Sequence, residues 1–280
     1  GSFYAIGIDD GSEVTSFRLD TGTVPSELTE NGKDQFLCYA DGVVYSVNYQ
    51  NGETLWEMPL KYQSLARIRL SNSGEYIACA DSFAVQIMDK DGNPYLSLPL
   101  KEEINGYITS LCWSKDDRYI AVELRIDSSF YQIGIFDFET SQFTLLEEQY
   151  LSIDHFSFGD TGLLYVIADN NQSSSLHFSD SAYLYRNEYD FLICSQGKVV
   201  SRHTIENYYP VSYCDVFDLS EDICVVLGNS VTLIDRMTEE SDTFYTDNEI
   251  ISVFYADDQY LDLTLTDGYR GTLWIQGEDV

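Results

Sequence analysis

Histidine carries much of the acid–base and metal chemistry of proteins near neutral pH, and the chain has three: His155, His177 and His203. Their spacing matches no metal-ligand pair, and the sequence contains no HExxH motif, no GxSxG nucleophile elbow and no glycine-rich phosphate loop. Each histidine is therefore interpreted as a turn or strand residue. A site assembled from distant strands would escape this test, so a hydrolase or lyase acting on a glycan or peptide is the alternative hypothesis.

The segment DKDGNP (89–94) places Asp89, Asp91 and Asn93 at the first three ligand positions of a calcium loop. The twelfth position is Leu100, where that geometry requires a bidentate Glu. A hairpin turn explains the segment better. Paired acids such as Asp116 and Asp117 point apart in strands and turns, so we predict no metal site and no cofactor.

Tyrosine and arginine offer a different chemistry, because these two residue types often carry the binding energy of protein interfaces. Several lie in the segments that would connect blades, or second to third strands, on one face of a repeat protein. The candidate binding residues are Arg125, Tyr150, Tyr183, Tyr185, Arg186, Tyr208, Tyr209, Tyr269 and Arg270. The alternative is structural, since a β-rich chain with 22 tyrosines also places them on strands.

The charge of the chain narrows the range of partners. Its 15 basic and 47 acidic side chains give a formal net charge of −32, which repels phosphate backbones and anionic lipids. No segment approaches the roughly 18 apolar residues of a membrane-spanning helix. We therefore expect a protein, peptide or glycan partner, no nucleic acid, no membrane insertion of these residues, and a monomer.

The start of the chain and its cysteines bear on its cellular location. Gly1-Ser2, without an initiator Met, indicates a cloning remnant, so we expect a signal peptide, membrane anchor or further domain in the native protein. The six cysteines lie in apolar, strand-like stretches without a CxxC pair, and we expect free, buried thiols. The compartment stays open, with an extracytoplasmic domain of a membrane-anchored bacterial protein favoured.

The chain contains a repeated sequence pattern, and the candidate residues lie within or between its units. Five segments share an apolar strand, a polar turn and a second apolar strand. They are IRLSNSGEYIACA (68–80), LCWSKDDRYIAVE (111–123), FSFGDTGLLYVIA (156–168), VFDLSEDICVVLG (216–228) and VFYADDQYLDLTL (253–265). Equivalent positions are 43, 45, 61 and 36 residues apart, and most of these separations fit a four-stranded propeller blade of about 40 residues.

The repeated pattern of inner strand, Ser/Asp/Gly turn and YIA- or LYV-like second strand resembles the WD-repeat-like β-propellers. The stretch GVVYSVNYQNGETLW (42–56) is similar to a quinoprotein-type propeller repeat. The Gly-His and Trp-Asp signatures of true WD repeats are absent. The resemblance therefore implies an architecture and assigns no active residue.

We expect an all-β fold, a β-propeller of four-stranded antiparallel blades in a single domain over 1–280. The first complete blade would be EVTSFRL, DQFLCYA, VVYSVNY and ETLWEMP, and FYAIGI (3–8) would supply the missing strand of the last blade and close the ring. This gives six blades, with seven as the alternative if residues 20–35 hide strands.

The long 61-residue separation contains an insertion at 168–190, which loops out on one face or forms an extra hairpin on its own blade. Repeats without a catalytic motif favour a non-enzymatic recognition or scaffolding propeller, with a purely structural spacer as a further hypothesis.

Overall fold

The computed structural model describes residues 2–6, 13–18, 26–30, 35–61, 65–100, 106–126, 130–169, 174–179, 182–208, 211–256 and 259–274. All regular elements in these ranges are β-strands, joined antiparallel to their partners. The chain divides into two compact units, residues 1–145 and 146–280, and each is taken by itself. No helix of the described residues is long and apolar enough to span a membrane.

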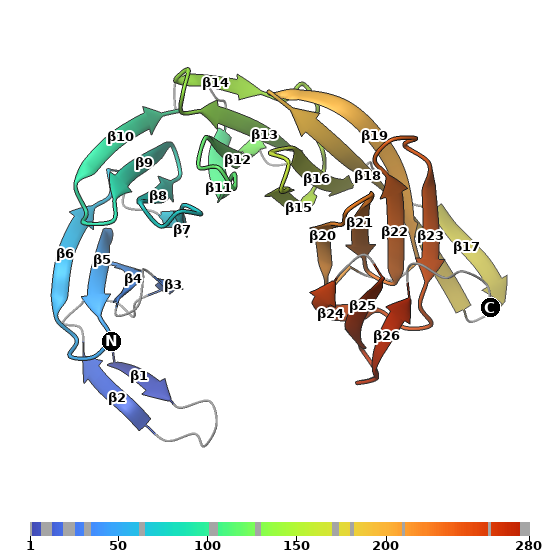
Figure 1. Ribbon diagram of the computed structural model, residues 1–280, viewed down its shortest axis with the longest axis horizontal. Coiled ribbons are helices and arrows are strands. Elements are labelled where there is room, and N and C mark those ends of the chain that lie inside the picture. Colours follow the sequence, from blue (N-terminus) through green and yellow to red (C-terminus); the bar gives the residue numbers. More distant parts are fainter. Residues whose placement is uncertain are drawn as a thin grey trace. The chain divides into compact units, whose positions relative to one another are not determined.

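The first unit contains a hairpin and three four-stranded sheets (Figure 1). The hairpin pairs β1 (Ser2–Ile6) with β2 (Glu13–Arg18). The sheets run in chain order: β3 (Ser26–Glu30), β4 (Gln35–Ala40), β5 (Val43–Asn48), β6 (Thr54–Pro59); β7 (Leu65–Leu70), β8 (Tyr76–Asp81), β9 (Ala84–Asp89), β10 (Pro94–Pro99); β11 (Gly106–Trp113), β12 (Tyr119–Ile126), β13 (Phe130–Asp137), β14 (Gln142–Leu145).

The second unit contains a five-stranded, a four-stranded and a three-stranded sheet among its described residues. Their strands are β15 (Ile153–Phe158), β16 (Leu164–Asp169), β17 (Ser174–Ser179), β18 (Ala182–Ser195), β19 (Lys198–Asn207); β20 (Cys214–Asp218), β21 (Asp222–Leu227), β22 (Ser230–Asp235), β23 (Ser241–Tyr245); β24 (Ile250–Ala256), β25 (Tyr260–Leu265), β26 (Arg270–Trp274).

The core lies between consecutive sheets. In the first unit, Ile77 and Met88 of one sheet pack with Leu37 and Val44 of the sheet before it. In the second unit, buried side chains of β16, β18 and β19 meet those of β21 and β22, and side chains of β21 and β22 meet those of β25. Both faces of the second and third strands of each four-stranded sheet therefore carry buried residues, whereas the outermost strands alternate between exposed and half-buried residues, as in β6 and β10.

Carboxylates also connect neighbouring sheets. Asp117, in the turn after β11, accepts hydrogen bonds from the backbone amides of Asn72, at 2.7 Å, and Ser73, at 3.1 Å, in the turn after β7. In the second unit, Asp218 at the end of β20 accepts hydrogen bonds from the Asp160 amide and from Tyr165 Oη, at 2.7 Å. Arg236 Nη2 forms an ion pair with Asp218. Each carboxylate thus joins a sheet to the one before it.

One expectation about the first sheet is corrected. The predicted inner strand EVTSFRL corresponds to β2, which pairs with β1; the strand that pairs with β4 is β3, inside the region 20–35. The N-terminal strand pairs with β2 in a local hairpin, and the sheet of β24, β25 and β26 holds three described strands. Antiparallel neighbours in the chain need only a short connection, which favours these local pairings.

The insertion at 168–190 extends the sheet of its own blade. β18 is 14 residues long; its C-terminal half pairs with β16 and its N-terminal part pairs with β17. On its other edge, β18 pairs with β19 over nine residue pairs. Residues 174–179 and 182–186 therefore form a hairpin that prolongs the third strand.

The cysteines agree with the expectation of free thiols that fill the core. All six are free, and Cys38, Cys79, Cys194 and Cys224 are buried. Burial raises the pKa of Cys38, Cys194 and Cys224 to about 12, so these thiols stay protonated near neutral pH. A thiol is a poor nucleophile in that state, which argues for a packing role.

Candidate functional site: two recognition surfaces

Arg125 lies between two tyrosines near the end of β12. The strand register places Tyr107 of β11 and Tyr131 of β13 directly opposite it. The guanidinium carbon lies 6.0 Å from the Tyr107 ring centroid and 5.7 Å from the Tyr131 centroid. A cation within about 6 Å of an aromatic ring centroid is attracted by the ring. Three adjacent strands thus present a Tyr–Arg–Tyr row, called here the Arg125 ladder (Tyr107, Arg125 and Tyr131).

The ladder lies at one end of its sheet, on the face opposite Ile108 and Leu124. The side chains of Ile108 and Leu124, next along the strands, are buried. Tyr107 is 37% exposed. Phe130, also exposed, precedes Tyr131 in β13 and therefore points to the other face of the sheet. An alanine at Gly106 would bring its Cβ within 2.3 Å of the Arg125 carbonyl oxygen, so glycine allows β11 to approach β12 at this edge. The arrangement combines an arginine with two aromatic rings, one of which is exposed.

Tyr150 is the predicted binding residue that the structure places in the interior. It is buried, and its hydroxyl donates a hydrogen bond of 3.4 Å to Asp190 Oδ2. Asp190 also forms an ion pair of 2.6 Å with Arg202 Nη1. Burial raises the pKa of Tyr150 well above its ordinary value. Its side chain stabilises the fold rather than facing a partner.

The remaining predicted residues fall on other elements of the second unit. Tyr208 is half-buried, donates a hydrogen bond of 3.0 Å to Glu206 Oε2 and packs its ring edge against Tyr245 at 5.6 Å between centroids. Tyr269 and Arg270 are exposed before and at the start of β26. The backbones of Tyr183, Tyr185 and Arg186 belong to β18, but their side chains lie outside the described residues, as does Tyr209.

Two histidines lie in polar networks of the second unit. His155 Nε2 on β15 is 2.9 Å from Ser157 Oγ and 3.7 Å from Asp215 Oδ1 on β20. Tyr213 continues the network by donating a hydrogen bond of 3.0 Å to Asp215 Oδ2. Burial lowers the pKa of His155, against the opposing effect of the Asp215 charge.

The His155 network does not have the geometry of a Ser-His-Asp relay. In such a relay the serine and the acid contact different ring nitrogens, whereas Ser157 and Asp215 both approach Nε2. His203 Nε2 lies 3.1 Å from Ser201 Oγ, which bonds to Glu239 at 3.0 Å, again with no acid on the second ring nitrogen among these contacts. No group of three or more His, Cys, Asp or Glu in the described residues could hold a metal ion.

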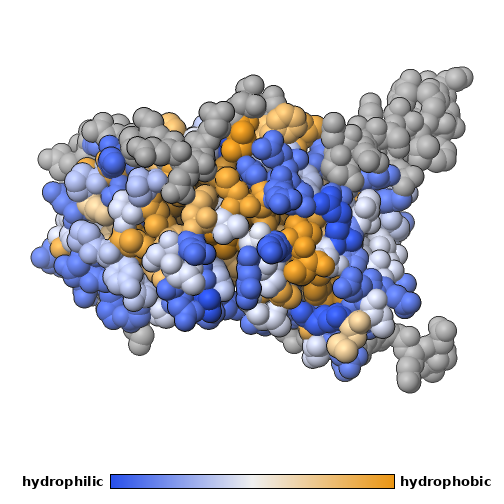
Figure 2. All heavy atoms as spheres, turned by 90° about the horizontal axis from the view of Figure 1, so that it is seen from above, coloured by the Kyte–Doolittle hydropathy of each residue, from blue (hydrophilic) through white to orange (hydrophobic). Residues whose placement is uncertain are grey.

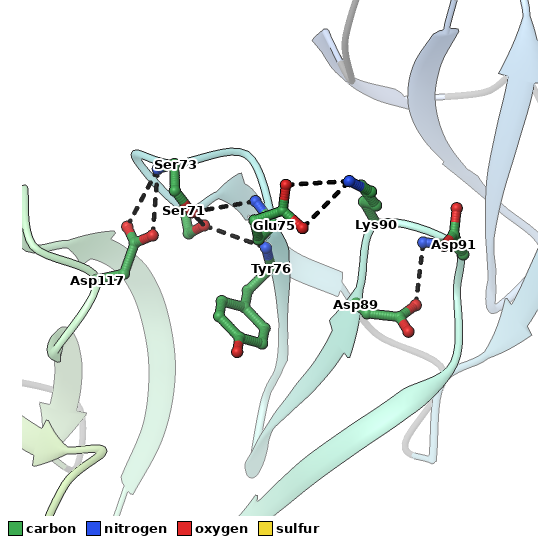
Figure 3. A network of polar contacts seen from close by, with 8 residues as sticks. All are labelled: Ser71, Ser73, Glu75, Tyr76, Asp89, Lys90, Asp91 and Asp117. Atoms are coloured by element: carbon green, nitrogen blue, oxygen red, sulfur yellow. Dashed lines mark hydrogen bonds and ion pairs between the residues drawn. The ribbon is translucent and has the colours of Figure 1, made fainter.

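The DKDGNP segment is a hairpin turn, as the sequence analysis favoured. Asp89 Oδ1 accepts a hydrogen bond of 3.0 Å from the Asp91 amide, as Figure 3 shows. It also accepts one of 2.8 Å from the Asn93 amide. Asn93 Nδ2 donates a further bond to Asp89 Oδ2, at 2.8 Å. These bonds lower the pKa of Asp89, with the Asn93 side chain contributing most. The carboxylate that would be the first calcium ligand is thus occupied by its own turn.

An aromatic surface that the sequence analysis missed lies beside these turns. It comprises Tyr76, Tyr95, Trp113 and Phe138, called here the turn-side aromatic patch. The four residues come from two sheets and lie up to 62 positions apart in the chain, so no local motif joins them. The positions of the four residues gave a usable signal. Each lies next to a turn that joins the first to the second strand of a sheet, or the third to the fourth, and these turns lie at the same end of the sheet.

The comparisons with known proteins show the fold. No family model matches the chain, and no curated protein matches its sequence. Among solved structures, the crystal structure of BamB from Moraxella catarrhalis matches with a TM-score of 0.56 and 14% identity, covering 100% of this chain and 78% of that one. The crystal structure of the tricorn protease matches with a TM-score of 0.55 and 12% identity, covering 93% of this chain and 30% of that one.

The chain has a β-propeller fold. Stacked antiparallel sheets of three to five described strands and the similarity to these two structures support this conclusion. In all, 976 chains of solved structures match, so the fold occurs too widely to indicate an activity. Function must be argued from the surfaces of this chain.

Proposed function

We propose that this chain is a non-enzymatic recognition propeller that binds a protein or peptide partner through the surface around the Arg125 ladder. The observation that carries the proposal is the contact of Arg125 with Tyr107 and Tyr131 on three adjacent strands, at an edge where Tyr107 is exposed. Arginine and tyrosine at the centre of an interface often cost about 2 kcal/mol or more when truncated.

The ladder is pre-organised for binding. Arg125 is held between two rings by the strand register, so less side-chain freedom is lost when a partner docks. A guanidinium in this position can form paired hydrogen bonds with a carboxylate or with backbone carbonyl groups of the partner. A glycan is the competing ligand class, because exposed tyrosine rings also stack on sugars.

The proposal includes the wider expectations from the sequence. It assumes one propeller domain over residues 1–280 with six blades, or seven, and a monomer that forms the extracytoplasmic part of a bacterial membrane-anchored protein. The six sheets of three or more described strands support the smaller number. Light scattering coupled to size-exclusion chromatography tests the monomer, which predicts one species of 31.9 kDa.

Site-directed photo-crosslinking tests the binding surface. A benzophenone amino acid replaces Tyr107 of the ladder in one sample and Tyr269 in a matched control, and both are exposed tyrosines. In extracts of the native source, we expect a discrete protein adduct at position 107 that is lost when Arg125→Ala is added. Equal adducts at both positions, or an adduct that survives Arg125→Ala, would overturn the proposal.

A further inference from the structure

The turn-side aromatic patch is an ordered aromatic surface with one strongly exposed member. The ring centroids of Tyr76 and Tyr95 lie 5.1 Å apart, and those of Trp113 and Phe138 lie 5.3 Å apart. Tyr95 and Phe138 stack at 6.3 Å, which joins the two pairs across neighbouring sheets. Tyr95 is 59% exposed, while the other three rings are half-buried. The patch therefore offers aromatic surface to a ligand.

A polar contact fixes one ring of the patch, and ring packing fixes the others. Trp113 Nε1 donates a hydrogen bond of 3.2 Å to the Arg69 carbonyl oxygen. Tyr76 packs against Tyr95, Trp113 and Phe138, and burial, followed by the nearby Tyr95 side chain, raises the pKa of Tyr76. A fixed aromatic surface loses little conformational freedom on binding.

The charges around the patch point to a cationic ligand. The same turns carry an excess of carboxylates: Glu75, Asp89, Asp91, Asp116, Asp117, Asp137 and Glu139, against Lys90, Lys115 and Arg118. Lys90 pairs with Glu75 at 3.0 Å, as Figure 3 shows, and Arg118 pairs with Asp137 at 3.0 Å and Glu139 at 2.7 Å. The seven carboxylates outnumber the three cations of these turns by four, so the surface is negative.

We infer that the turn-side aromatic patch, with the carboxylates that border it, binds a lysine- or arginine-rich segment of a partner protein. Aromatic faces and carboxylates both attract a cationic side chain, and the aromatic rings also bury its alkyl part. The net charge of the chain favours the approach of such a segment. A neutral glycan gains no such attraction, and phosphate or acidic ligands are repelled. This surface uses other residues than the Arg125 ladder.

Fluorescence anisotropy of the full chain with a labelled peptide of alternating glycine, lysine and arginine tests the inference. The variants are Tyr95→Ala, Tyr95→Phe, which keeps the ring, and Tyr269→Ala, which removes a tyrosine of similar exposure, 62%, in the other unit. We expect Tyr95→Ala to weaken binding about two- to fivefold, the range of one exposed cation–π contact. Tyr95→Phe and Tyr269→Ala should bind like wild type.

Two controls separate the patch from the diffuse charge of the chain. The measurement is repeated at about 0.3 M NaCl, where interactions between exposed charges are largely screened, and the ratio between wild type and Tyr95→Ala should persist. Equal binding by Tyr95→Ala and wild type, or equal losses in the Tyr95→Ala and Tyr269→Ala variants, would overturn the inference. So would Tyr95-dependent binding of maltohexaose in place of the peptide, because that result would assign the patch to glycans.

Discussion

At the scale of single residues, Asp218 illustrates how one carboxylate stabilises the junction of two sheets. It accepts hydrogen bonds from the Asp160 amide and Tyr165 Oη and pairs with Arg236, and its side chain is 9% exposed. Asp218→Ala would leave these donors without their shared acceptor. Removing one partner of a buried ion pair costs about 3 kcal/mol or more. We expect a loss of about 3 kcal/mol in the free energy of unfolding, measured by urea denaturation.

The conservative variant distinguishes lost charge from lost hydrogen bonding. Asp218→Asn keeps an acceptor oxygen for Tyr165 or the Asp160 amide, so it should lose less stability than Asp218→Ala. Asp91→Ala, at an exposed turn position, is the control and should leave the unfolding curve unchanged. If Asp218→Ala and Asp91→Ala unfolded at the same urea concentration, the link would contribute nothing.

His155 gives a prediction about pH. Burial lowers its pKa below the ordinary value of 6.5, with Asp215 opposing the shift. The unfolded chain therefore binds a proton on this residue at a higher pH than the folded chain does. The contribution of His155 to stability is present above about pH 6.5 and is lost as the pH falls through the folded pKa.

The pH effect is measured by comparing wild type with His155→Gln. Both proteins share the carboxylates that titrate at lower pH, so the difference between their unfolding free energies isolates the histidine. We expect wild type to lose more stability than the variant between pH 7.5 and 5.5. Parallel losses, or a larger loss in the variant, would contradict the assignment.

At the scale of elements, Gly134 shows how a side chain of the outermost strand packs against the third strand of the same sheet. A Cβ at Gly134 of β13 would lie 2.2 Å from the ring of Phe143 on β14. The phenyl ring therefore occupies the space that a side chain would fill. Gly134→Ala should cost about 1–3 kcal/mol, the usual range for overpacking, by thermal or urea unfolding.

A double variant tests whether the ring causes that cost. Phe143→Ala removes the clashing atoms, so the penalty of Gly134→Ala should be smaller in the Phe143→Ala background than in wild type. Additive losses would show instead that the glycine is required by the backbone of β13.

Strands were predictable from the sequence wherever apolar residues repeat around a polar turn. All five repeat segments are pairs of first and second strands, from β7–β8 to β24–β25. β3 escaped because SELTE holds two acids and no run of apolar residues, so pairing with β4 rather than composition defines it. β18 runs into the predicted insertion at 168–190, because a strand can continue into polar sequence when β17 and β19 supply partners.

The candidate sites were predictable only in part. The sequence indicated Arg125 as a binding residue, but not its position between two rings, which the register of β11, β12 and β13 creates. The contacts of the turn-side aromatic patch could not be predicted from the sequence. They depend on the packing of Tyr76 against Trp113 of another sheet, whose ring centroids lie 6.4 Å apart. The sequence shows the type of each residue, whereas contacts between residues of separate sheets depend on how the sheets stack.

At the scale of the whole molecule, the acidic side chains of each unit surround the apolar layers between its sheets. On the face seen in Figure 2, hydrophobic residues form bands with hydrophilic residues on either side. Buried apolar clusters between sheets stabilise each unit, and the surface must accommodate 47 acidic against 15 basic side chains. Like charges brought together by folding repel one another, so the net charge of −32 opposes compaction.

This repulsion makes stability depend on salt in a defined direction. The screening length falls from about 30 Å at 0.01 M to about 10 Å at 0.1 M ionic strength, which weakens repulsion between distant carboxylates more than attraction within close ion pairs. We expect the Tm, followed by circular dichroism at pH 7.5, to rise mainly over this range and then level off. NaCl and KCl should give the same curve, because screening depends on ionic strength rather than on a specific ion. A Tm that falls with salt would show that ion pairs such as Arg236–Asp218 outweigh the repulsion.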